Sequence, residues 1–94
     1  MPEFETKPVT LFTTAWCPYC LRAKSLFQQK GVEFNEISVD GDYEKRQEMM
    51  RLSGRHTVPQ IWVGKTHVGG CDELMGLERN GKLDELLAEL DAPN

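Results

Sequence analysis

The sequence AWCPYC, from Ala15 to Cys20, holds two cysteines three positions apart at a point where the local pattern changes. The residues before it, Val9–Thr14, are rich in β-branched and aromatic side chains, which predicts a strand. After Pro18 the apolar side chains repeat at helical spacing, and Gly31 ends the pattern. The chain is therefore expected to begin with a strand that leads into a helix, with the cysteine pair at the helix start.

The remaining segments continue this alternation of strands and helices. Strands are predicted at Val32–Val39, Gln60–Val63 and Thr66–Val68, and helices at 42–52, 72–79 and 82–90, with Asp42 and Asp72 as N-caps. The order is βαβαββαα. Its first βαβ unit implies two parallel strands, and the tight turn at Gly64-Lys65 implies an antiparallel pair. The predicted fold class is α/β, with a four-stranded mixed β-sheet and helices on both faces.

Length and charge limit the classes of partner. The 94 residues predict a single domain over 1–94, with residues 1–8 as a loose lead-in. The net charge of -4 and the lack of a basic stripe argue against nucleic acid as a partner. No apolar run has the roughly 20 residues of a membrane span, and the acidic N-terminus lacks the apolar core of a signal peptide. We therefore expect a cytoplasmic protein that binds neither nucleic acid nor membrane, and a monomer because no long apolar helix face demands a dimer.

The cysteine pair could be a metal clip, a structural disulfide or a redox couple. A structural zinc site needs four ligands, and only Cys71, His56 and His67 remain to complete one, without the usual short spacing. A permanent disulfide does not suit a reducing compartment, and three is an odd number of cysteines. No metal site is therefore predicted. A CxxC at the junction of a strand and its helix is instead typical of a redox motif.

The position of each cysteine predicts its role. Cys17 lies at or just before the first helical turn, and Pro18 suits the first helical position. The free N–H groups and the positive end of the helix dipole favour a thiolate there, and Arg22 and Lys24 add positive charge. Cys17 is therefore predicted to be the nucleophile. Cys20 lies one turn inward, where it should be more buried and act as the resolving thiol.

Three motifs together carry a family resemblance. With CPYC at this place, TVP at Thr57–Pro59 and GGCDEL at Gly69–Leu74, the chain resembles a glutaredoxin, and most of all the small dithiol glutaredoxins of bacteria, the glutaredoxin 3 subfamily. The resemblance extends from about Val9 to Leu87. It implies a thioredoxin fold and an enzyme that takes glutathione as its co-substrate.

The resemblance also implies a set of glutathione-binding residues. Val58-Pro59 resembles the cis-proline bond that the family places opposite the nucleophile, which leaves the backbone of Thr57 and Val58 free to pair with glutathione. Gly70 lets the backbone turn closely before the next helix. A helix N-terminus is an anion site, which in the family holds the γ-glutamyl carboxylate while Asp72 meets the α-ammonium group. Cys71 is expected mainly to pack beside the cleft.

Two further residues match family positions, and one departs from the family pattern. Tyr19 should flank the glutathione sulfur, and Arg46 should pair with the glycyl carboxylate. The family often has a lysine three residues before the nucleophile, where this chain has Thr14. We therefore expect weaker glutathione binding, by roughly 0.5–1 kcal/mol, which is the strength of an exposed ion pair.

The function expected from these residues is a glutathione-dependent thiol–disulfide oxidoreductase. It would reduce protein–glutathione mixed disulfides and protein disulfides, and ribonucleotide reductase is a target that the resemblance suggests. Two alternatives stay open at this point. One is a thioredoxin-like electron donor served by a flavin reductase, against which GGCD argues. The other is a carrier of a glutathione-ligated [2Fe–2S] cluster, which the rigid Pro18 disfavours.

Overall fold

The computed structural model describes residues 7–91 and has the expected order of elements. The elements are β1 (Val9–Thr13), α1 (Pro18–Gln29), β2 (Phe34–Ser38), α2 (Tyr43–Ser53), β3 (Gln60–Val63), β4 (Thr66–Gly69), α3 (Cys71–Arg79) and α4 (Lys82–Asp91). The predicted order βαβαββαα is confirmed. Most of the expected lead-in, residues 1–6, lies outside the described part of the chain, so that prediction and the single domain over 1–94 remain predictions.

The four strands form one mixed sheet in the order β2-β1-β3-β4. β1 runs parallel to β2 and antiparallel to β3, and β4 runs antiparallel to β3. Every residue of β1 and β3 is buried, because these two strands are central and both of their faces are covered. The parallel pair and the antiparallel pair are both as predicted.

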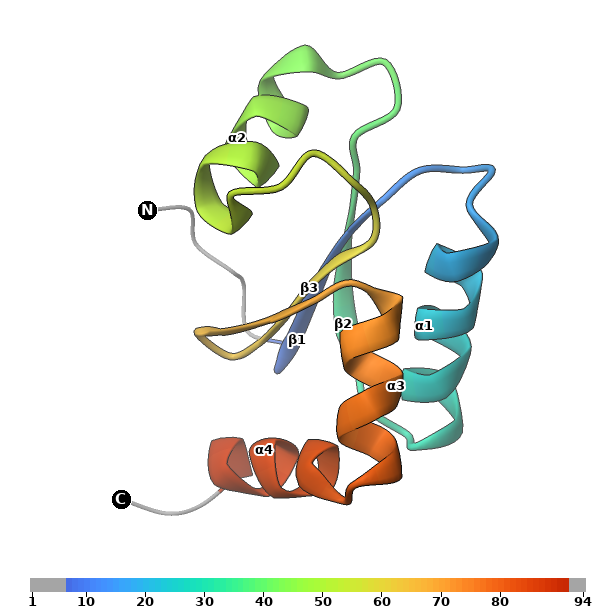
Figure 1. Cartoon of the computed structure of the whole chain (residues 1–94), viewed down its shortest axis with the longest axis vertical. Helices are drawn as coiled ribbons and strands as arrows, with labels where there is room; N and C mark the ends of the chain where they lie inside the picture. Colours follow the sequence, from blue (N-terminus) through green and yellow to red (C-terminus); the bar gives the residue numbers. More distant parts are fainter. Residues whose placement is uncertain (1–6, 92–94) are drawn as a thin grey trace.

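Helices cover the two faces of the sheet (Figure 1). Alternate side chains of β1 and β3 enter two different apolar clusters, since successive strand residues point to opposite faces. One cluster joins α1, α3 and α4 to the sheet and consists of Val9, Leu11, Ala23, Phe27, Ile61, Val63, Leu74 and Leu83. The other joins α2 to the opposite face and consists of Phe12, Val39, Met49 and Trp62. This packing fixes the starts of α1 and α3 relative to the loop that precedes β3.

Two elements start at other residues than predicted, and several predicted ends differ by one residue. Asp72 is not an N-cap, because Gly70 takes that position and α3 begins at Cys71. β2 begins at Phe34 rather than Val32, since the Val32 N–H donates to the Phe27 carbonyl over 2.9 Å and so belongs to the end of α1. Asp42 does cap α2 as predicted, with its side chain accepting from the Lys45 N–H.

The helices of residues 7–91 are too short or too polar to cross a bilayer.

Candidate active site

Cys17 is itself the N-cap of α1. Its Sγ atom accepts a hydrogen bond from the Cys20 N–H over 3.2 Å, and Pro18 begins the helix as predicted. An N-cap side chain normally supplies an oxygen to one of the free N–H groups of the first turn. Here a sulfur has that position, and the same N–H groups and helix dipole stabilise negative charge on it. The local fold therefore places the Cys17 sulfur where the first turn of α1 donates a hydrogen bond to it.

The two cysteines differ in exposure, and both are free thiols. Cys17 is 8% exposed and Cys20 is 1% exposed, so the predicted order of burial is confirmed. Burial and the hydrogen bond with Cys17 raise the pKa of Cys20 to about 12. Cys20 consequently stays protonated at neutral pH and does not compete with Cys17 as a nucleophile.

The positive charge expected near Cys17 is partly engaged elsewhere. Lys24 forms an ion pair with Glu36 on β2, with Nζ and Oε2 2.8 Å apart. The Arg22 guanidinium lies 6.0 Å from the centre of the Tyr19 ring, at the edge of cation–π range. The helix start is therefore the more direct source of stabilisation for a thiolate at Cys17.

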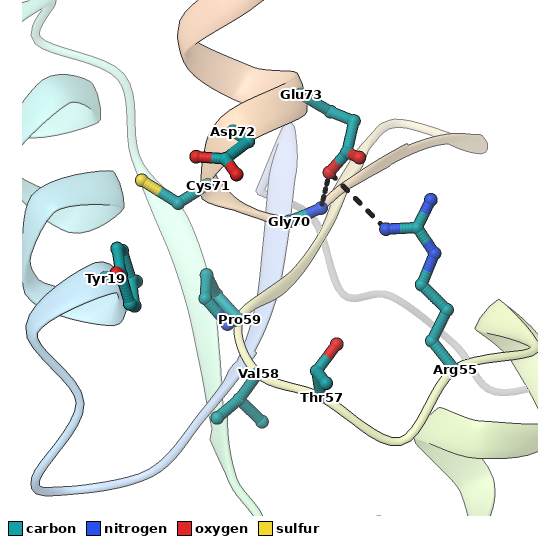
Figure 2. Close-up of a pocket in the computed structure, with 9 residues that line it drawn as sticks. All are labelled: Tyr19, Arg55, Thr57, Val58, Pro59, Gly70, Cys71, Asp72 and Glu73. Carbon is teal, nitrogen blue, oxygen red and sulfur yellow. Dashed lines mark hydrogen bonds and ion pairs between the residues drawn. The ribbon is translucent and has the colours of Figure 1, made fainter.

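A pocket of about 220 Å³ opens where the starts of α1 and α3 approach the loop before β3 (Figure 2). Its walls come from three segments far apart in the sequence. The lining residues are Tyr19, Arg55, Thr57, Val58, Pro59, Gly70, Cys71, Asp72 and Glu73. Seven of the eight residues expected to bind glutathione are in this group, which the sheet and its helices bring together.

Cys17 meets this pocket at the loop before β3. Its Sγ atom lies 3.9 Å from the Val58 carbonyl oxygen, which is within reach of a thiol donor. The Val58-Pro59 peptide bond is cis, as predicted. The Cys17 sulfur thus lies beside the loop before β3, which forms one wall of the pocket.

Arg46 is the expected residue that the pocket does not include. Its Nη1 atom donates to the His56 carbonyl oxygen over 3.3 Å, which places the guanidinium against the loop rather than in the pocket lining. The role expected for Arg46 therefore remains a prediction.

Arg55 and Glu73 line the pocket but were missed by the sequence analysis. Glu73 Oε1 accepts from the Gly70 N–H over 2.7 Å and lies 3.4 Å from Arg55 Nη1 (Figure 2). The Gly70 N–H, more than Arg55, holds the pKa of Glu73 below its usual range. A glutamate at the third helical position often reaches back to the N-cap N–H, so the GCDE stretch carried a signal for Glu73. The sequence held no comparable signal for Arg55.

Cys71, the third thiol, also lines the pocket and is buried. Burial raises the pKa of Cys71, so it is not poised as a second nucleophile. The residues 7–91 contain no group of three or more histidine, cysteine, aspartate or glutamate side chains arranged to hold a metal ion.

Comparison with known proteins matches this architecture to one family. A profile of glutaredoxins matches residues 9–68. The chain belongs to the glutaredoxin family. This glutaredoxin is 64% identical over 81 residues to the protein named Glutaredoxin from Pseudomonas aeruginosa, across 86% of this chain and 96% of that relative. It is 52% identical over 79 residues to Glutaredoxin 3 of Escherichia coli K12, across 84% of this chain and 95% of that relative.

A solved structure agrees with the fold. The crystal structure of a buckwheat glutaredoxin–glutathione complex superposes on this glutaredoxin with a TM-score of 0.84 at 33% identity, covering 97% of this chain and 86% of the other. The thioredoxin fold and the resemblance to glutaredoxin 3 are both confirmed. Family membership makes this glutaredoxin a thiol–disulfide oxidoreductase.

Proposed function

We propose that this glutaredoxin is glutathione-dependent and reduces protein–glutathione mixed disulfides and protein disulfides. The observation that carries the proposal is the position of Cys17, whose Sγ caps α1 and lies 3.9 Å from a wall of the pocket. A glutathione molecule in that pocket would have its sulfur beside the nucleophile. The buckwheat relative was solved as a complex with glutathione, which supports the same ligand here.

The chemistry of the pocket suits the groups of glutathione. Its γ-glutamyl carboxylate would meet the first turn of α3, where N–H groups lack partners within the helix. Its ammonium group would meet Asp72, and its peptide backbone would pair with Thr57 and Val58. The proposed binding residues are Tyr19, Arg46, Thr57, Val58, Pro59, Gly70, Cys71 and Asp72. Arg55 adds a cation to the same wall.

In the monothiol route Cys17 is the only cysteine that reacts. Its thiolate attacks the glutathione sulfur of a mixed disulfide, forming a Cys17–glutathione bond and breaking the bond to the target protein. The target sulfur leaves as a thiolate and takes a proton from solvent. A second glutathione thiolate then attacks the bound glutathione sulfur, which releases glutathione disulfide and restores the Cys17 thiolate. The net reaction consumes one glutathione thiol from solution, and the other half of the glutathione disulfide comes from the substrate, where its sulfur is already part of a disulfide.

In the dithiol route Cys20 resolves the intermediate. Cys17 attacks a protein disulfide, which forms a Cys17–target mixed disulfide and releases one target thiolate. Cys20 then attacks Cys17, which releases the second target thiolate and leaves a Cys17–Cys20 disulfide for glutathione to reduce. Because Cys20 is buried with a pKa of about 12, it must give up its proton as it attacks. The neighbouring target thiolate released in the first step is a suitable acceptor. We further propose a cytoplasmic site of action, since reduction by glutathione needs a reducing compartment.

The test is turnover of a small glutathione mixed disulfide by the Cys20→Ser variant, with glutathione as the reductant. Substitution at Cys20 keeps the backbone N–H that donates to Cys17 Sγ, so the nucleophile keeps its environment. We expect turnover within about three-fold of wild type, since no bond to Cys20 forms in this route. Cys17→Ser is the matched control and should have no activity.

Two results would count against the proposal. The first is a Cys20→Ser variant without activity while Cys17→Ser keeps it, which would reverse the roles of the cysteines. The second is a wild-type protein that ignores glutathione and accepts electrons only from a flavin reductase. That result would place the chain with thioredoxin-like donors and remove the assignments of Thr57, Val58 and Asp72.

A further inference from the structure

Gln60 closes the loop that forms one wall of the pocket. Its side chain is fully buried at the start of β3 and turns back along the chain toward Thr57. The Nε2 atom donates to the Thr57 carbonyl oxygen over 3.0 Å and to Thr57 Oγ1 over 3.2 Å. A carbonyl oxygen only accepts, so the amide nitrogen of Gln60 must face Thr57 and its oxygen must face the other way.

The oxygen of Gln60 meets His67 on the neighbouring strand. Gln60 Oε1 and His67 Nε2 are 2.8 Å apart, and an amide oxygen only accepts, so His67 Nε2 carries the proton. The His67 ring also lies on Trp62, with centroids 4.6 Å apart and an interplanar angle of 32°. Trp62 and His67 are paired residues of β3 and β4. His67 therefore has its ring plane set by Trp62 and its donor directed at Gln60.

We propose that His67 is a positioning residue for the substrate site, acting through Gln60 on Thr57. This inference rests on the proposed function, because Thr57 is a proposed contact of glutathione and lines the pocket (Figure 2). Every polar atom of the buried Gln60 amide is committed, two bonds to Thr57 and one to His67. Without the His67 donor, a buried oxygen loses its partner and the amide no longer has one preferred orientation. Thr57 would then lose the two bonds that fix its carbonyl and hydroxyl.

Substitutions at two points of this chain test the proposal. His67→Phe keeps a flat ring against Trp62 but removes the donor, and Gln60→Met keeps a long buried side chain but removes the amide. Each is expected to raise the Michaelis constant for the glutathione mixed disulfide by roughly three- to ten-fold, the equivalent of one or two lost hydrogen bonds. The value of kcat should change by less than about two-fold, because the hydrogen-bond partner of Cys17 Sγ in this loop is the Val58 carbonyl, whose bond Gln60 does not make.

The double variant distinguishes a connected chain from two separate structural effects. If His67 acts through Gln60, adding His67→Phe to Gln60→Met should raise the Michaelis constant no further. A variant that folds less well lowers the concentration of active enzyme but leaves the Michaelis constant unchanged. Thr66→Ala, an exposed position on the same strand, is the matched control and should behave as wild type.

Three outcomes would overturn the proposal. They are a wild-type Michaelis constant in His67→Phe, a wild-type Michaelis constant in Gln60→Met, and fully additive effects in the double variant. The wild-type protein is assayed in the same experiment, so that failure of the proposed function can be told apart from failure of the inference about His67. If wild type does not turn over the glutathione mixed disulfide, the proposed function fails. If wild type turns it over and both single variants match it, only the inference about His67 fails.

Discussion

Glu73 places a negative charge on the wall of a pocket proposed to bind an anion. Its carboxylate accepts from the Gly70 N–H and pairs with Arg55, which also lines the pocket. Glu73→Gln removes the charge but keeps a side-chain oxygen that can accept from the Gly70 N–H. Because glutathione carries two carboxylates and one ammonium group, we expect this variant to bind it more tightly.

The size of the effect follows from the pocket. A volume of about 220 Å³ corresponds to a space roughly 6 Å across, so a ligand charge lies about that far from the wall. Two unit charges 6 Å apart interact by about 0.7 kcal/mol at the dielectric constant of water. Loss of that repulsion should lower the Michaelis constant for glutathione by about three-fold. A lower effective dielectric constant at the partly covered wall would increase the effect.

The assay is steady-state reduction of a small glutathione mixed disulfide at low and high ionic strength. The difference between Glu73→Gln and wild type should be largest at low salt and shrink at high salt, because salt screens exposed charges. Glu89→Gln, an exposed residue of α4 outside the pocket, changes the net charge equally and controls for long-range effects. A Michaelis constant that is unchanged or higher in Glu73→Gln would refute the reasoning, as would an equal change in Glu89→Gln.

The same substitution should lower stability. Glu73 lies in the first turn of α3, where a carboxylate interacts well with the helix dipole, so its loss should cost up to about 1 kcal/mol. For a domain of this size that corresponds to a fall in Tm of about 4–8 °C. The lowered pKa of Glu73 sets the pH dependence, since its contribution is fully present above the unfolded pKa and is lost as pH falls through the folded one. The difference in Tm between wild type and variant should therefore narrow in acid.

Two further predictions concern the glycyl end of the site and the core. Thr14→Lys should lower the Michaelis constant for glutathione by about two- to five-fold, because the lysine adds an exposed ion pair. Steady-state kinetics measure this constant, and an unchanged value in Thr14→Lys would exclude the ion pair. Phe27→Ala should lower the free energy of unfolding by about 3–5 kcal/mol, because the ring is fully buried between α1 and the sheet. Urea unfolding followed by circular dichroism measures this, and a loss below about 1 kcal/mol would contradict the assignment of Phe27 to the core.

Most of the fold follows from local signals in the sequence. The end of α2 was predictable because Gly54 supplies the left-handed residue that follows the helix, with φ of 74°. β1 was predictable because it is rich in β-branched and aromatic side chains, and β3 because a short run with apolar side chains follows Pro59. The start of α3 was misplaced because an aspartate is a common N-cap, whereas here a glycine has that position and Glu73 completes the cap from inside the helix.

The site was less predictable where it depends on contacts between distant segments. Tyr19, Thr57 and Asp72 were found because they belong to motifs that the resemblance covers. Arg55 was missed because its place in the pocket follows from the packing of the loop before β3 against α3. The link from His67 to Thr57 likewise depends on strand pairing, which a linear sequence does not display.

The sulfur that caps α1 is also the atom that changes oxidation state, and this couples folding to redox chemistry. A thiolate at Cys17 completes the helix start, whereas a Cys17 bonded to another sulfur has lost the negative charge that the N–H groups stabilise. In a thermodynamic cycle, the free energy by which the folded chain stabilises the Cys17 thiolate is lost when that sulfur forms a disulfide. The thiolate form of Cys17 therefore gains a stabilisation from folding that the disulfide form lacks. This makes Cys17 the better leaving group when another thiolate attacks its mixed disulfide, a step in which the Cys17 sulfur takes up the electron pair of the broken bond and returns to its free state.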